Sequence, residues 1–180
     1  MKRLSLLTLL AVLCFILPVV AQDEMKEEAG MGAEMMPPPA LDDEFLSWLV
    51  GEWEGTSEGT MGMSKDNYKM SIGLNSQFLL MEVNSDMNGT PFTGMGAVTL
   101  AQDGSLAGYW IDSYRLMAAG KGSREGDVET IVWTDQMGGV YTRVTKKIDE
   151  NTFEVTGKYV MGDQVMEDKG VMTRKMMTDK

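Results

Sequence analysis

Residues 45–55 read F-L-S-W-L-V-G-E-W-E-G, an apolar stretch followed by glycine and then by tryptophan among acidic residues. The apolar residues of its first half have the spacing of one helical face: Phe45, Leu46, Leu49 and Val50. Acidic residues 42–44 stand just before them, where the positive end of a helix dipole favours anions. The stretch therefore predicts a short helix that ends at Gly51.

After Gly51 the pattern changes to a period of two. Glutamates at positions 52, 54 and 58 alternate with small or aromatic residues, which are Trp53, Gly55, Ser57 and Gly59. In a strand, successive side chains point to opposite faces of the sheet. We therefore expect a strand with its acidic residues outward and Trp53 on the inner face.

Turn signals recur at an even interval along the rest of the chain. They lie at 61–64, 75–76, 88–89, 103–104, 113–114, 125–126, 138–139, 150–151 and 162–163. Asn-Gly and Asp-Gly pairs among them favour two-residue hairpins. Nine turns separate ten strands, and the spacing leaves no room for crossover helices. The sequence predicts an all-β fold: an up-and-down antiparallel β-barrel of about ten strands with a short N-terminal helix.

Two motifs carry a resemblance to a known superfamily. Gly51-Glu52-Trp53 matches the G-x-W opening of calycins, which include lipocalins and fatty-acid-binding barrels. Together with G-Y-W-I-D-S at 108–113, residues 46–53 resemble an uncharacterised bacterial calycin-like family, a domain of unknown function related to nitrobindin. The resemblance covers roughly residues 41–175. It implies that a basic residue on the last strand packs across Trp53, and Arg174 stands at a suitable place. We expect this contact to close the barrel.

The N-terminal residues have the pattern of a secretory signal peptide. Lys2 and Arg3 precede an apolar run at 4–20, and Ala21 is followed at once by acidic residues. We predict a signal peptide over residues 1–21 and a secreted or periplasmic protein, with no membrane span after cleavage.

Residues 22–40 are acidic and then rich in glycine, methionine and proline. Because they hold too few bulky residues to bury a core, they predict a disordered linker. The calycin-like barrel domain is expected over residues 41–180.

Composition excludes several kinds of chemistry. The chain has no histidine, and its single cysteine, Cys14, lies in the predicted signal peptide. The predicted mature chain therefore has no disulfide, thiol nucleophile, histidine triad or histidine–metal site, and we predict neither a metal nor a cofactor. This departs from nitrobindin, whose haem iron is held by a histidine. The formal net charge of −11 also argues against nucleic acid or an anionic membrane as a partner.

Several predicted strands have one apolar face, which barrel closure places inside. Asp112 shares its predicted face with Trp110, and Glu82 shares one with Phe78 and Leu80. The candidates for contacting a ligand are Tyr68, Glu82, Trp110, Asp112, Trp133 and Tyr159. Methionines are adaptable enough to fill such a lumen instead, at positions 70, 81, 95, 117, 161, 166 and 172.

Three classes of function fit these features. The leading hypothesis is a binding protein for a small hydrophobic ligand of unknown identity. One alternative is a structural or interaction module of the cell envelope with a filled barrel, and another is a barrel enzyme that uses a buried carboxylate. We expect a neutral or weakly cationic ligand, because the net charge repels anions. A monomer or a weak dimer is expected, since a closed barrel has no free strand edge.

Overall fold

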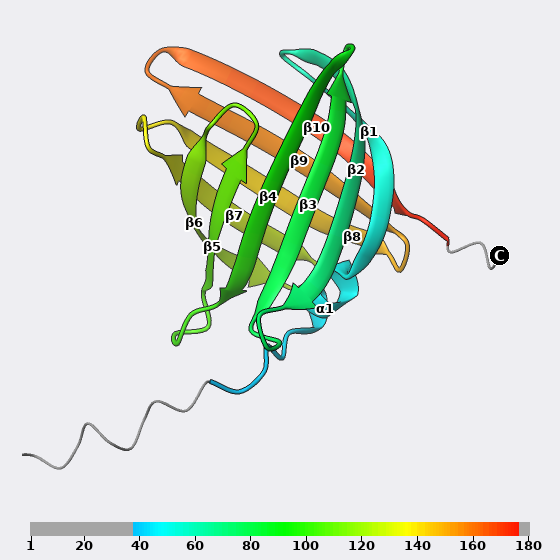
Figure 1. Cartoon of the computed structure of the whole chain (residues 1–180), viewed down its shortest axis with the longest axis vertical. Coiled ribbons are helices and arrows are strands. Elements are labelled where there is room, and N and C mark those ends of the chain that lie inside the picture. The colour runs from blue at the N-terminus through cyan, green and yellow to red at the C-terminus, as the bar shows by residue number, and fades with distance from the viewer. Residues whose placement is uncertain (1–37, 177–180) are drawn as a thin grey trace, which may run out of the picture. The chain divides into compact units, whose positions relative to one another are not determined.

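Each strand pairs antiparallel with the next one in the chain, and the first pairs with the last to close a barrel (Figure 1). The strands are β1 (Gly51–Gly59), β2 (Gly62–Gly73), β3 (Phe78–Met87), β4 (Thr90–Leu100), β5 (Leu106–Asp112), β6 (Met117–Glu125), β7 (Val128–Asp135), β8 (Val140–Asp149), β9 (Thr152–Met161) and β10 (Gln164–Arg174). This computed structural model describes residues 38–176. It confirms the predicted ten-strand, up-and-down antiparallel barrel with a short helix.

The predicted signal peptide, residues 1–21, lies outside the described residues. Residues 22–37 of the predicted linker lie outside them as well. Its last part, residues 38–40, is exposed and carries neither helix nor strand. Within residues 38–176, no helix has the length and apolar character that crossing a membrane requires.

Helix α1 (Glu44–Leu49) lies across one end of the barrel (Figure 1). Asp43 is its N-cap, and the carboxylate accepts a hydrogen bond from the backbone N–H of Leu46 at 2.9 Å. The other carboxylate oxygen of Asp43 accepts one from Arg124, at the end of β6, at 2.7 Å. The cap therefore also ties the helix to the barrel wall.

The seam between β1 and β10 is built on one pair of residues. Trp53 and Arg174 are cross-strand partners, and the guanidinium carbon of Arg174 lies 4.1 Å from the Trp53 ring centroid. Arg174 also donates hydrogen bonds to the carbonyl oxygens of Val50, at 2.6 Å, and Trp48, at 2.7 Å. One side chain thus joins the last strand, the first strand and the end of the helix.

The packed core occupies the half of the barrel nearest α1. The rings of Trp53 and Phe153 meet edge to face with their centroids 4.8 Å apart, and Trp48 covers them from the helix. The largest fully buried side chains are Trp53, Phe153, Leu46, Leu79, Met172 and Val98. The strands continue well beyond this cluster, which leaves the other half of the lumen for a cavity.

Candidate functional site

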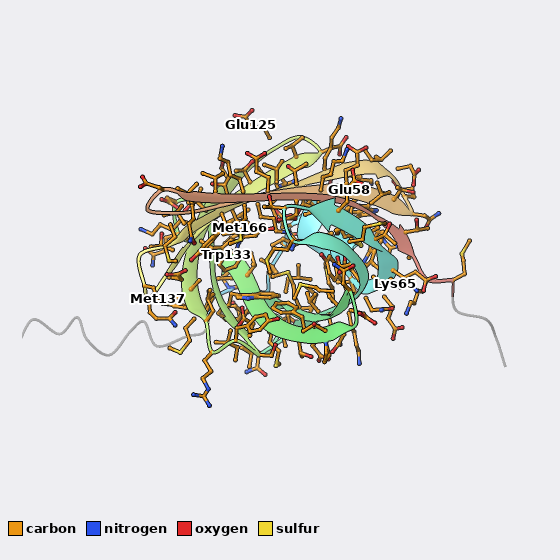
Figure 2. All side chains as sticks on the ribbon, turned by 90° about the horizontal axis from the view of Figure 1, so that it is seen from above. Glu58, Lys65, Glu125, Trp133, Met137 and Met166 are labelled. Carbon is orange, nitrogen blue, oxygen red and sulfur yellow. The ribbon has the colours of Figure 1, made fainter. Side chains whose placement is uncertain are left out.

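A cavity of about 350 Å³ occupies the half of the barrel away from α1. It opens between the turns at that end, which we call the mouth, and the mouth is lined by residues 59–63, Met87, Leu116, Gly139 and Glu167. Figure 2, seen from the mouth side, shows Trp133 within the ring of strands and Glu125 projecting outside it. The lumen is therefore open and not filled.

Two indoles lie along one wall of the cavity. Trp110 of β5 lies across Gly94 and Gly96 of β4, so closely that a Cβ atom at either glycine would collide with the ring. Trp133 of β7 covers Gly120 of β6 in the same way. We call this side, formed by Trp110 and Trp133, the aromatic wall. Glycine at these inward positions lets large side chains pack outward from the axis and leave free space.

Polar groups line the opposite side of the lumen. The hydroxyl of Tyr141, on β8, donates to the carboxylate of Asp168, on β10, with distances of 3.3 and 3.4 Å to its two oxygens. Between them on β9 is Gly157, where any side chain would collide with both groups. On β2, Asp66 accepts hydrogen bonds from Ser57 at 2.6 Å and Ser64 at 3.1 Å.

Arg143 of β8 reaches into the lumen between these groups. Its guanidinium carbon lies 5.3 Å from the ring centroid of Tyr68, and its Nε is 3.5 Å from the hydroxyl of Thr145. No carboxylate oxygen of residues 38–176 lies within 4.0 Å of this guanidinium. We call the side formed by Asp66, Tyr68, Tyr141, Arg143 and Asp168 the polar wall.

Burial shifts the ionisation of the polar wall. It raises the pKa of the Tyr68 and Tyr141 phenols, which therefore stay protonated and remain hydrogen-bond donors. Burial also raises the pKa of Asp168, although the positive charge of Arg143 opposes the shift. The wall thus presents two neutral phenols, the permanent cation of Arg143, and the carboxyl groups of Asp66 and Asp168.

Below the cavity, Glu129 of β7 is buried with 6% of its surface exposed. It pairs across the strands with Thr145, while Ile131 pairs with Arg143, so Glu129 is a diagonal neighbour of Arg143 on the inner face. Burial raises the pKa of Glu129 to about 7, against the lowering effect of Arg143.

Of the predicted ligand-contacting residues, the structure places Tyr68, Trp110, Asp112, Trp133 and Tyr159 at the cavity. Asp112 mainly holds its turn: it accepts hydrogen bonds from the backbone N–H groups of Tyr114 and Leu116, at 2.9 and 3.3 Å. Tyr159 donates to Asp135 at 2.8 Å, which holds the phenol at the mouth.

Glu82 is a correction, because its side chain is exposed on the outside of the barrel. The inward residues of β3 are Leu79, Met81, Val83, Ser85 and Met87. Phe78 and Leu80, which suggested an inward face for Glu82, lie on the outer side, so the predicted phase is wrong by one residue. Among the methionines proposed to fill the lumen, Met95 and Met117 are exposed outside it.

Sequence reasoning missed the centre of the polar wall. It named neither Arg143, Asp66 nor Asp168, because a charged residue in a strand is ordinarily solvent-exposed. A signal was present, since Tyr141, Arg143 and Thr145 share one phase of β8. An arginine in the same phase as a tyrosine and an inward threonine indicates a cation inside the barrel.

Comparisons with known proteins bear on the fold. No protein-family model matches the sequence, and no curated protein matches it either. Among solved structures, Rv2717c from M. tuberculosis matches with a TM-score of 0.56 and 15% identity, over 73% of this chain and 95% of that chain. A redesigned β-barrel, mFAP1, bound to DFHBI, matches with a TM-score of 0.47 and 14% identity, over 73% and 100%. The likeness to Rv2717c shows the fold alone, and membership in the calycin-like family stays a prediction.

Proposed function

We propose that this protein binds a small, flat, largely apolar molecule in the lumen of its barrel, and that it does so as a secreted or periplasmic protein. The observation that carries the proposal is the open cavity of about 350 Å³ between an aromatic and a polar wall. Small-molecule sites in proteins have volumes of about 300–1,000 Å³ and combine apolar surface with a few oriented polar groups. The cavity has both properties.

The aromatic wall supports a ligand that is flat. Trp110 and Trp133 lie along the wall, and stacking or edge contacts with such rings contribute about 0.5–1.5 kcal/mol beyond the burial of area. Each 100 Å² of apolar surface that leaves water contributes about 2.5 kcal/mol more. After the cost of immobilising the ligand, these terms are sufficient for micromolar binding of a molecule with two or three rings.

The test is a pair of substitutions at adjacent residues of β6. Ala118 is buried and lines the cavity, whereas Ala119 is exposed on the outside of the same strand. We expect the neutral fluorophore N-phenyl-1-naphthylamine to bind the wild type, with a change in tryptophan fluorescence. Ala118→Leu should weaken that binding at least about tenfold by occupying the space, while Ala119→Leu should leave it unchanged.

Thermal unfolding provides a second measurement. At a hundred times the dissociation constant, the ligand should stabilise the wild type by about 2.7 kcal/mol. The proposal fails if the fluorophore and a panel of apolar ligands leave both fluorescence and stability unchanged, or if the two alanine variants lose binding equally.

A further inference from the structure

Arg143 is a cation inside the cavity, and no carboxylate oxygen of residues 38–176 lies within 4.0 Å of its guanidinium group. A guanidinium group has five N–H donors, and in Arg143 the Thr145 hydroxyl, 3.5 Å from Nε, and the Tyr68 phenol engage only part of this set. Removing a cation from water is unfavourable unless hydrogen-bonded anions compensate for the lost solvation. Donors that face an open cavity are therefore available to a ligand.

The carboxylates of the polar wall accept hydrogen bonds from hydroxyl groups. Asp66 accepts hydrogen bonds from Ser57 and Ser64, and Asp168 accepts one from Tyr141. In the polar wall the carboxylates thus pair with hydroxyl groups, and the guanidinium group keeps donors that no carboxylate accepts from. Because hydrogen bonds between ionised groups are roughly twice as strong as neutral ones, the ligand group that fits best here is an anion.

Glu129 is a buried carboxyl group whose charge interacts with that of Arg143. The charged groups that act on Glu129 are Arg143, Asp43 and Arg124. Arg124 forms an ion pair of 2.7 Å with Asp43. Arg143 is therefore the cation with the larger effect on the pKa of Glu129. An anion that binds Arg143 would bring a second negative charge close to Glu129 and favour its neutral form.

We propose that Arg143 is a subsite for an acidic group, a carboxylate or sulfonate on a flat apolar ligand, and that Glu129 takes up one proton from solvent when this group binds. The proposal rests on the function proposed above and specifies its ligand class as acidic amphiphiles. It departs from the neutral or cationic ligand that the net charge suggested, because a direct hydrogen-bonded contact with the Arg143 guanidinium outweighs the carboxyl groups of Asp66 and Asp168, which lie farther from it.

Two fluorophores with the same aromatic body test this inference. 8-Anilino-1-naphthalenesulfonate carries a sulfonate that N-phenyl-1-naphthylamine lacks, and that sulfonate stays ionised throughout the working pH range. Any pH dependence of the affinity ratio therefore reports on the protein. In the wild type, the preference for the sulfonate should fall by up to about tenfold from about pH 6 to about pH 8, as Glu129 ionises.

Matched variants assign the effect to residues. Arg143→Gln should reduce the affinity for the sulfonate, relative to that for the neutral fluorophore, about ten- to a hundredfold. Arg115→Gln removes the same charge from an exposed turn outside the cavity and should leave the ratio unchanged. Glu129→Gln should abolish the pH dependence and keep the strong preference seen at low pH.

Each outcome decides between the two proposals. Two results would overturn the anion subsite and leave the proposed function intact. In the first, the wild type binds the neutral fluorophore and shows no preference for the sulfonate. In the second, Arg143→Gln and Arg115→Gln have equal affinity ratios. A pH-dependent ratio that persists in Glu129→Gln overturns the proton uptake. Failure of both fluorophores to bind overturns the proposed function together with the subsite.

Discussion

Arg174 combines a cation–π contact with two hydrogen bonds to carbonyl oxygens, so removal of the side chain affects several elements at once. Trp53→Ala should cost roughly 3–5 kcal/mol of unfolding free energy as a buried aromatic truncation, and Arg174→Ala about 1–2 kcal/mol. In a double-mutant cycle measured by urea denaturation, we expect coupling above about 0.5 kcal/mol. Additive effects would mean that another pair closes the barrel.

Glu129 gives the stability a dependence on pH with a definite sign. Burial raises its pKa from 4.5 to about 7, so the folded protein binds the proton more tightly than the unfolded chain. Stability therefore falls as pH rises from about 4.5 to 7, by at most about 3 kcal/mol from this group. In urea denaturation, the unfolding free energy of Glu129→Gln relative to that of the wild type should be higher at pH 8 than at pH 5. Parallel pH profiles would show that Glu129 does not titrate in this window.

At the scale of elements, the stability of α1 depends on the contacts of its N-cap residue. Asp43 caps the helix and holds Arg124, whereas the neighbouring Asp42 is exposed. Asp43→Ala should cost about 1–3 kcal/mol in urea denaturation, because it removes the cap and one partner of a partly buried ion pair. Asp42→Ala serves as the control and should change stability by less than about 0.5 kcal/mol. Equal effects of the two substitutions would contradict this role.

The helix and the strand order could be predicted from sequence because their signals are local. The acidic residues before Phe45, and turn pairs such as Asn88-Gly89, act on neighbouring residues only. The inner face of β3 could not be predicted, because apolar residues occur on both sides of that strand. The predicted inward face of Glu82 is therefore wrong, although the predicted turns on either side of the strand agree with its ends.

At the scale of the whole molecule, the open lumen could not be predicted from sequence. It depends on Trp110 lying across Gly94 and Gly96, and these residues meet only after β4 and β5 pair in one register. The same holds for the polar wall, where Tyr141 and Asp168 meet over Gly157 of the strand between them. A period of two identifies faces of a strand, but it does not say how much of the enclosed space side chains fill.

The outer surface also has an apolar region on adjacent strands. Met95, Ile111 and Met117 are register neighbours across β4, β5 and β6, and all three are exposed. Tyr109 lies beside them with 73% of its surface exposed. A monomer or a weak dimer stays the prediction, and side chains of this kind are the contacts that a weak dimer of closed barrels has available.

The seam between β1 and β10 has a consequence for folding kinetics. Every other strand pairing joins neighbours in the chain, whereas Trp53 and Arg174 are roughly 120 residues apart in sequence. Hairpins form in microseconds, but closure must wait until the whole ladder has curved far enough for its ends to meet. Until then both edges of the sheet can pair with other chains. The rate of closure therefore sets how long a newly made chain is exposed to aggregation.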